Sequence, residues 1–369
     1  MPVMNAKATT ATGEWFGHPK GLFVLFFTEM WERFSYYGMR SLLVLYMAKY
    51  LINKADNGLD VLGYAAIRHF VQWFVGLFGM RGELSVQALS SQIYGLYTGF
   101  VYFTPFFGGI LADRVFGQRK SVYIGGVLMA IGHFLMAVES MFFVALFFLI
   151  LGNGCFKPNI STQVGNLYPE GDHRRDSAFT IFYMGINLGA FFSPLVCGTL
   201  GQKVGWHYGF GAAGVGMIAG LCIYHFGKHL LPPDRIMVKS SSTDAAADQK
   251  ITPTEWKAIG ALVFLCMVNI VFWAVYEQQG NTLQLWADAN TRWQFFGFNI
   301  PSSWYQSFNP AFIFLFAPFM DKFWGWQDKR GKEPSSVTKM GIGCILLGVA
   351  FVIMIAASKV VGPSEQGSL

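Results

Sequence analysis

Charged residues are scarce in this chain of 369 residues. Asp, Glu, Lys and Arg make up 13% of it, about half of what soluble domains carry. Hydrophobic residues make up 53%, and the mean hydropathy is +0.39. This balance excludes an ordinary soluble domain and indicates an integral membrane protein.

Cysteine is rare as well. The five cysteines stand singly in apolar segments, without C-x-x-C spacing: Cys155, Cys197, Cys222, Cys266 and Cys344. This pattern argues against a disulfide framework and against a zinc site, so we expect small buried thiols. Residues 1–20 lack an apolar core, which argues against a cleavable signal peptide. The first apolar segment itself would then direct membrane insertion.

Long apolar runs are what the chain has in abundance. A helical crossing takes about 20 mainly apolar residues. Nine candidate spans follow: 21–48, 86–112, 120–138, 141–165, 178–200, 207–228, 257–280, 303–320 and 338–357. Hydrocarbon offers no hydrogen-bond partners to the backbone, so membrane spans are helices or strands of a closed barrel. Barrel strands have only about ten residues of alternating polarity, which these longer apolar segments do not match. The sequence therefore predicts an all-α membrane protein.

A polar segment with three prolines divides the spans into two groups. We expect a cytoplasmic tail over 1–20, a six-helix bundle over 21–230, a cytoplasmic linker over 231–255, three helices over 256–357 and a polar tail over 358–369. Six spans, a basic linker and further spans resemble the major facilitator architecture, in which two six-helix bundles surround a central site. By that comparison the second bundle is incomplete in this chain.

The net charge of +6 reflects membrane topology rather than a nucleic-acid ligand. Lys and Arg residues outside the spans gather on alternate connections, together with the N-terminal tail, which places the N-terminus in the cytoplasm. The apolar stretch within 51–85 could be a tenth span, but it would then move Arg114, Arg119 and Lys120 outside. We favour an interfacial amphipathic helix or an extension of the first two spans.

The stretch EMWERFSYYGMR, Glu29 to Arg40, carries four charges inside the first span. At about 100° per residue, six of its side chains fall on one helix face: Glu29, Glu32, Arg33, Tyr36, Tyr37 and Arg40. A structural ladder of ion pairs, with Glu29 and Arg33 at i,i+4, is one interpretation. However, each charge at the membrane centre costs at least about 2.5 kcal/mol, so we favour a functional cavity facing this helix.

Two further charges lie deep in spans, Lys157 in the fourth and Glu277 in the seventh. With the first span they make three acids and three bases, which fits a polar cavity whose charges exchange partners. Snorkelling of Lys157 to an interface is the alternative. In such a cavity the cations would hold a carboxylate of the solute, and the acids would hold its amine. A buried carboxylate can also carry a proton. The aromatic side chains of Tyr36, Tyr37 and Tyr102 could line the pocket. The pattern predicts a proton-linked transporter of a zwitterionic solute.

Several motifs resemble one known family. EMWERFSYYG is similar to the ExxERFxYYG signature of the proton-coupled oligopeptide transporters, a branch of the major facilitator superfamily. Further similarities are GNGCFKPN, FYMGINLGAFFSPL, FWAVYEQQGN and QSFNP, and GGILADRVFGQRK resembles the general facilitator loop between spans two and three. The resemblance extends from Glu29 to Pro310, and the first motif is its most specific part.

The resemblance implies proton-driven import of di- and tripeptides. It implies proton handling by Glu29, Glu32 and Arg33, a peptide carboxylate near Arg33 and Lys157, and an outer gate formed by Arg40 with Glu277. By the same resemblance, the peptide-binding residues are Arg33, Tyr36, Tyr37, Arg40, Tyr102, Lys157, Asn187, Glu277 and Asn309. Protons are the coupling ion, and neither a cofactor nor a metal is expected. In the family a tenth span supplies an acid that pairs with the fourth-span lysine, and we expect that inner contact to be missing after Ala357.

Three alternatives stay open at this stage. The chain could be a facilitator carrier of an amino acid, nitrate or a similar solute, or a truncated form that binds peptide without transport. A membrane-embedded enzyme would use His133, His207, His225 or His229, of which the last two have the i,i+4 spacing of a metal pair but no evident third ligand. We expect a transporter and not an enzyme. The expected setting is a monomer in a plasma membrane, the bacterial inner membrane, with peptide, protons and lipid as partners and no nucleic acid.

Overall fold

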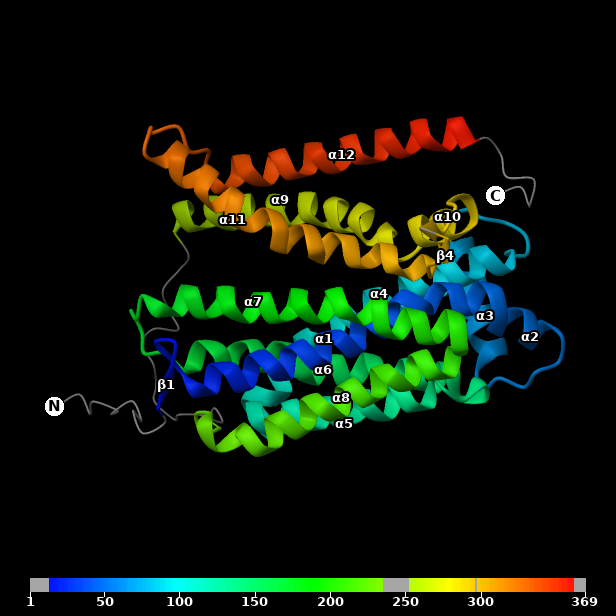
Figure 1. Ribbon diagram of the computed structural model, residues 1–369, viewed down its shortest axis with the longest axis horizontal. Coiled ribbons are helices and arrows are strands. Elements are labelled where there is room, and N and C mark those ends of the chain that lie inside the picture. Colours follow the sequence, from blue (N-terminus) through cyan, green and yellow to red (C-terminus); the bar gives the residue numbers. More distant parts are fainter. Residues whose placement is uncertain (1–12, 235–251, 296, 362–369) are drawn as a thin grey trace. The chain divides into compact units, whose positions relative to one another are not determined.

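The computed structural model describes residues 13–234, 252–295 and 297–361 (Figure 1). The chain forms two compact units. The first comprises Met1–Met237 together with Trp293–Phe316, and the second comprises Val238–Arg292 together with Ala317–Leu369. Each unit has its own packing.

The first unit contains long helices at all six predicted spans, which confirms that part of the prediction. They are α1 (Lys20–Tyr46), α4 (Val86–Leu111), α5 (Gln118–Leu135), α6 (Phe142–Asn166), α7 (Arg174–Ser193) and α8 (Trp206–Gly227). A short hairpin of β1 (Glu14–Trp15) and β2 (His18–Pro19) precedes α1. Helix α7 continues through the π-helical turns η4 (Pro194–Gly198) and η5 (Leu200–Val204), and η2 (Ala112–Phe116) similarly extends α4.

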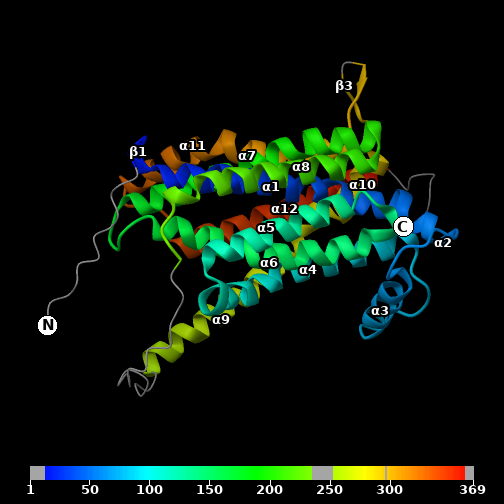
Figure 2. The same ribbon diagram turned by 90° about the horizontal axis from the view of Figure 1, so that it is seen from below.

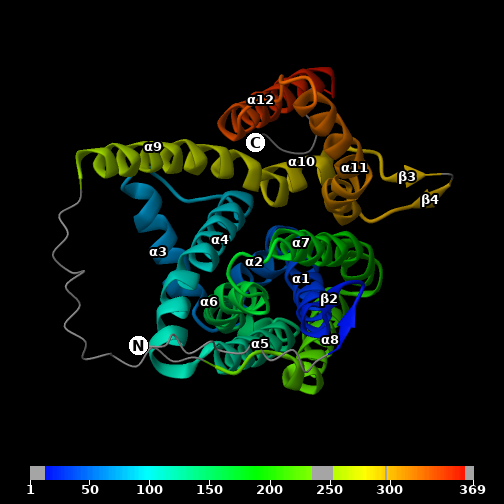
Figure 3. The same cartoon turned by 90° about the vertical axis from the view of Figure 1, so that its left-hand side faces the viewer.

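Helix α1 lies inside this bundle, packed against α7 and α8, while α6 packs against α4 and α5 (Figure 3). Glycines permit the closest approaches. A Cβ atom on Gly108 of α4 would collide with the carbonyl oxygen of Gly154 in α6. A Cβ on Gly125 of α5 would lie 2.6 Å from the carbonyl oxygen of Gly152. Small residues at these positions let the helix backbones approach each other closely.

The stretch 51–85 extends the first span and then forms a short helix. Helix α1 runs on through η1 (Met47–Leu51) into α2 (Ile52–Asp56), and α3 (Tyr64–Gly76) follows with 13 residues. Thirteen residues are too few to cross a membrane, for which about 20 are needed. The structure therefore supports the extension with a short helix over a tenth span.

The second unit is built of helices at the remaining predicted spans. It holds α9 (Pro253–Tyr276), η7 (Glu277–Gly280), α10 (Thr282–Asn290), the later part of α11 (Phe308–Asp328) and α12 (Ser336–Val361). Helix α9 starts with a capping box, in which the hydroxyl of Thr252 accepts from the amide of Glu255 and the carboxylate of Glu255 accepts from the amide of Thr252. Among the described residues, six of the nine long helices are apolar enough to cross a membrane by composition alone; α1, α5 and α11 fall short.

The segment between α10 and α11 groups with the first unit, whereas the sequence suggested assigning it to the second bundle. It contains the hairpin of β3 (Gln294–Phe295) and β4 (Phe298–Asn299), which projects from the bundle (Figure 2), and the 3₁₀ helix η8 (Ser302–Ser307). The indole of Trp304 donates to the hydroxyl of Thr199 at 2.8 Å, and the amide of Gln202 donates to the hydroxyl of Ser302 at 2.9 Å. These contacts attach η8 to the end of α7.

The predicted linker 231–255 lies mostly outside the described residues, since 235–251 are not described. The prediction for the thiols is only partly right. All five cysteines are free, but Cys197 alone is buried, and Cys222 and Cys266 are exposed. Both exposed residues sit on helix faces that no described neighbour covers, and an apolar sequence does not distinguish a face toward lipid from one toward protein.

Candidate functional site

The polar face of α1 points into the first unit. Glu29, Glu32, Arg33, Tyr36 and Arg40 are all buried, with at most 5% of each residue exposed. The sixth member of the predicted face, Tyr37, is half-buried, and its ring lies 5.2 Å from that of Tyr36. The helical spacing therefore predicted the inward face correctly.

An ion cluster forms around Arg33. Its Nε lies 3.2 Å from Oε1 of Glu29, which confirms the predicted i,i+4 pair. Its Nη2 also donates to Oε1 of Glu32 at 2.8 Å, and its Nε donates to the other oxygen of the same carboxylate. One guanidinium thus serves two buried carboxylates, and Oε2 of Glu29 has no hydrogen-bond partner among the described atoms. This arrangement can release the cation when a carboxylate takes up a proton.

Arg40 lies two turns further along α1 in an aromatic setting. Its Nε donates to the hydroxyl of Tyr94 at 2.6 Å, and its guanidinium lies 5.8 Å from the ring centres of Tyr37 and Tyr94. Tyr94 of α4 was not among the predicted site residues, because only the tertiary fold brings α4 beside α1. The predicted gate partner Glu277 is the first residue of η7, directly after α9 in the other unit, so that pair stays a prediction.

Lys157 of α6 faces the same region from a second helix. Its Nζ lies 4.6 Å from the ring centre of Tyr102 in α4, a cation–π distance. Its ammonium also interacts electrostatically with the carboxylate of Glu29. The structure therefore brings Lys157 and Tyr102 to the α1 cluster, which favours a cavity lysine over a snorkelling one.

The two predicted asparagines differ in their surroundings. Asn187 of α7 is buried, and its Nδ2 donates to the carbonyl of Tyr183 one turn earlier at 2.9 Å. Asn309 is exposed at the start of α11, in the part that groups with the first unit. Their expected contacts with peptide stay predictions.

One buried polar residue at this site was missed by the sequence analysis. Asn153 of α6 is 2% exposed; its Oδ1 accepts from Nη2 of Arg33 at 3.5 Å, and its Nδ2 donates to the carbonyl of Val101 at 2.9 Å. The motif GNGCFKPN contained it, and a polar side chain between two glycines of an apolar span was the available signal.

The histidines show no arrangement suited to metal chemistry. Nδ1 of His225 pairs with the hydroxyl of Tyr123 at 3.0 Å, and Nδ1 of His229 pairs with the carbonyl of Phe226 at 2.8 Å. Helix α8 ends at Gly227, so the i,i+4 register of these two histidines is broken. Within residues 13–234, 252–295 and 297–361 no group of three potential ligands could hold a metal ion.

The loop after α4 engages the start of the linker. The amide of Arg119 donates to Oδ1 of Asp234 at 2.7 Å, and its guanidinium donates to the carbonyl of Leu231. Gly117, with φ of +80°, makes room for the carboxylate, which sits at the N-terminus of α5 where the helix dipole favours an anion. Hydrogen bonds therefore hold the facilitator-like loop against the start of the linker.

The loop after α6 is fastened to the N-terminal hairpin. Arg174 pairs with Asp172 and with Glu14, each at 2.9 Å, and Nδ1 of His18 pairs with the hydroxyl of Tyr168 at 2.8 Å. Hydrogen bonds from Arg174 lower the pKa of Asp172 to about 2. Burial raises the pKa of Tyr168 to about 12. The hairpin, this loop and the start of the linker thus share one end of the bundle.

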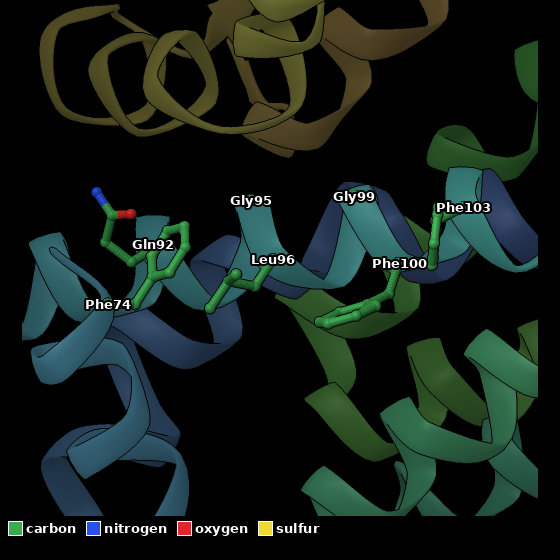
Figure 4. A pocket seen from close by; sticks show the side chains of 7 residues that line it. All are labelled: Phe74, Gln92, Gly95, Leu96, Gly99, Phe100 and Phe103. Atoms are coloured by element: carbon green, nitrogen blue, oxygen red, sulfur yellow. The ribbon is translucent and has the colours of Figure 1, made fainter. Parts of the chain in front are cut away.

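A pocket of about 400 Å³ opens elsewhere, between α3 and α4 (Figure 4). It is lined by Phe74, Gln92, Gly95, Leu96, Gly99, Phe100 and Phe103. Phe74 projects from α3, and the other lining residues follow one another along α4. The lining contains no charged group, so this pocket is unsuited to a zwitterionic solute and is separate from the cluster around Arg33.

The sequence profile of the POT family matches residues 119–243 and 234–364. A di-/tripeptide transporter of Lactococcus lactis subsp. cremoris is 34% identical over 99% of this chain and 80% of its own length. An uncharacterized transporter of Bacillus subtilis is 35% identical over 92% of this chain and 74% of its own.

Solved structures agree. A crystal structure of a mutant of the peptide transporter POT in complex with sulfate has a TM-score of 0.71 and 32% identity, covering 97% of this chain and 78% of that one. A POT family transporter in complex with 5-aminolevulinic acid has a TM-score of 0.74 and 29% identity, covering 92% and 77%. These relatives are transporters, not enzymes. The protein is a multi-pass membrane transporter of the major facilitator type, and it belongs to the POT family.

Proposed function

We propose that the protein imports di- and tripeptides together with protons by alternating access. The observation that carries the proposal is the buried cluster in which Arg33 serves Glu29 and Glu32. The named activity of the Lactococcus relative supports peptide as the solute. Amino acid or nitrate transport has no comparable support.

Proton coupling follows from competition for one guanidinium. While both carboxylates are charged, they hold the guanidinium of Arg33. Protonation of Glu29 or Glu32 from outside weakens these pairs, and the guanidinium can then accept a peptide carboxylate with help from Lys157. Inward release of the peptide lets the carboxylates lose their protons and recapture Arg33.

The remaining parts of the cycle are extensions of this proposal. Arg40 pairs with Glu277 when the outer side closes and stays with Tyr94 when it opens. A membrane potential drives inward movement of positive charge, at about 2.3 kcal/mol per charge per 100 mV. The protein works as a monomer in the bacterial inner membrane with its N-terminus in the cytoplasm, without a cofactor.

Purified protein in liposomes tests the proposal. Labelled dialanine should exchange against unlabelled dialanine and accumulate when an inward proton gradient is imposed. Glu32→Gln should keep the exchange but lose the gradient-driven accumulation, because a neutral side chain cannot carry a proton. Glu333→Gln, in an exposed ion pair with Lys339, is the matched control and should retain both activities.

Three outcomes would count against it. If an amino acid or nitrate exchanges and dialanine does not, the solute is wrong. Binding of dialanine without exchange would indicate a form that does not transport. Full accumulation by Glu32→Gln would remove Glu32 from proton coupling.

A further inference from the structure

Asn153 occupies an unusual place in α6. Its neighbours Gly152 and Gly154 are the points where α5 and α4 approach α6 most closely. A Cβ on Gly154 would lie 2.8 Å from Cβ of Thr104, and one on Gly152 would lie 2.7 Å from the carbonyl oxygen of Gly125. The amide side chain of Asn153 is therefore confined between packed helices, and only 2% of the residue is exposed.

A proline in α4 explains one of those partners. In an α-helix the carbonyl of Val101 would accept from the amide of residue 105, four positions later. Residue 105 is proline, which has no N–H, so the helix leaves this carbonyl open. Nδ2 of Asn153 donates to it at 2.9 Å. Asn153 thus satisfies a backbone group that Pro105 has released.

This hydrogen bond fixes the direction of the amide. A carbonyl only accepts, so the NH₂ group of Asn153 must face Val101 and its oxygen must face the other way. That oxygen lies toward Nη2 of Arg33, a donor. Lys157 follows Asn153 by one helical turn, so the two share a face of α6.

The other groups around Arg33 are charged or titratable. From α1 come Glu29, Glu32 and Tyr36, whose ring centre lies 5.0 Å from the guanidinium. Tyr97 of α4 and Tyr37 of α1 also lie near Arg33. The amide oxygen of Asn153 differs from all of these because its accepting strength does not depend on a proton.

We propose that Asn153 is a positioning residue for Arg33, holding the guanidinium beside Lys157 whether the carboxylates of α1 are charged or neutral. The inference deepens the proposed function, on which it rests. Pro105 orients Asn153 through the carbonyl of Val101, and Asn153 orients Arg33. In the protonated state this leaves the two cations aligned for one peptide carboxylate rather than apart.

Asn153→Leu tests the inference by exchange of labelled dialanine across a pH series. Loss of a hydrogen bond to a charged group should raise the KM about tenfold, with the maximal rate reduced less than about twofold. Asn159→Leu is the matched control, since Asn159 is also buried on α6 and donates to the carbonyls of Cys155 and Gly108 without touching a charged group. Its KM should stay within about twofold of the wild type, whatever its melting temperature.

A second variant separates positioning from folding. Pro105→Ala combined with Asn153→Leu returns an N–H to the carbonyl of Val101, so the melting temperature should recover while the KM stays high. Recovery of the KM in this double variant would overturn the proposal, because Asn153 would then serve only the backbone. An unchanged KM in Asn153→Leu alone would overturn it as well.

A third measurement does not depend on the solute. In a double-mutant cycle on melting temperature, Asn153→Leu and Arg33→Leu should be coupled, whereas Asn159→Leu and Arg33→Leu should be additive. Additivity in both cycles would refute the contact even if dialanine proves to be the wrong solute. Failure of the wild type to exchange dialanine, with coupling intact, would instead count against the proposed function alone.

Discussion

The two units differ in how their helices use glycine. In the first unit, glycines such as Gly108 and Gly125 mark places where an added Cβ would collide with another helix. In the helices of the second unit, added Cβ atoms would meet nothing within 4 Å at Gly260, Gly325, Gly341, Gly343 and Gly348. The same residue thus serves close packing in one unit and leaves an open surface in the other.

The more apolar helices belong to the second unit, where those five glycines make no close contacts. Helices α9 and α12 contain the most apolar windows of the candidate spans, and no residue of those windows is buried. The helices of the first unit are less apolar and enclose side chains such as Glu29 and Arg33. Apolar residues therefore allow a helix to insert into the bilayer, whereas small residues and paired polar groups determine how helices pack against one another.

The largest effect should come from the ion cluster. Arg33→Leu leaves two buried carboxylates without their cation, which costs about 3–5 kcal/mol. Lys339→Leu in the second unit breaks the part-exposed pair with Glu333 and should cost about 0–1 kcal/mol. Melting temperatures in detergent should fall clearly for the first variant only, and less at low pH, where the carboxylates are neutral. Equal falls would remove the contrast between the units.

Backbone contact between helices should give the next effect. Gly108→Ala forces α4 away from Gly154 of α6 and should destabilise by about 1–3 kcal/mol. Gly343→Ala in α12 meets open space and replaces a poor helix former, so no loss is expected. Thermal unfolding followed by size-exclusion chromatography compares the two. A stable Gly108→Ala protein would show that the close approach of α4 and α6 is wrong.

The placement of η8 in the first unit predicts a smaller effect. Trp304→Phe removes the hydrogen bond to Thr199 and should cost about 1 kcal/mol. Independently, a Cβ on Gly198 would lie 3.0 Å from Cβ of Ser303. This is shorter than the roughly 3.5–4.5 Å between the Cβ atoms of a disulfide, so Gly198→Cys with Ser303→Cys should form a disulfide on oxidation once the two segments separate by about 0.5 Å. A mobility shift on gels that reverses with reductant reports it, with Gly211→Cys and Ser303→Cys as the control pair. The absence of a cross-link at the first pair would contradict the assignment of η8 to the first unit.

The smallest effect concerns the loop after α6. Because Arg174 lowers the pKa of Asp172 to about 2, from 3.8, the pair contributes fully above about pH 4 and is lost as pH falls toward 2. Hydrogen exchange of residues 167–175 should be slower in the wild type than in Asp172→Asn at pH 5 and above. The two proteins should converge near pH 2. A difference that disappears between pH 7 and 5 would contradict this assignment.

Local periodicity explains what the sequence could predict. The nine long helices of the described residues and the polar face of α1 depend on residues within one segment, such as Glu29 and Arg33 at i,i+4, so spacing alone located them.

What the sequence could not predict depends on which helices become neighbours. The hydrogen bonds of Arg40 with Tyr94 and of Asn153 with Val101 join helices more than 45 residues apart. The exposure of Cys222 and the hydrogen bond of Trp304 to Thr199 also depend on the tertiary structure. The roles of Asn187, Asn309 and Glu277 came from family resemblance, and no contact described here tests them.

The glycine contacts among α4, α5 and α6 carry a mechanical consequence. Where Gly108 of α4 and Gly125 of α5 meet backbone atoms of α6, there is little side-chain material between the helices that could change rotamer, so they cannot slide or tilt there without separating. These three helices should move through the transport cycle as one rigid block. Spectroscopic labels placed only on α4, α5 and α6 should therefore keep constant spacing while the transporter turns over.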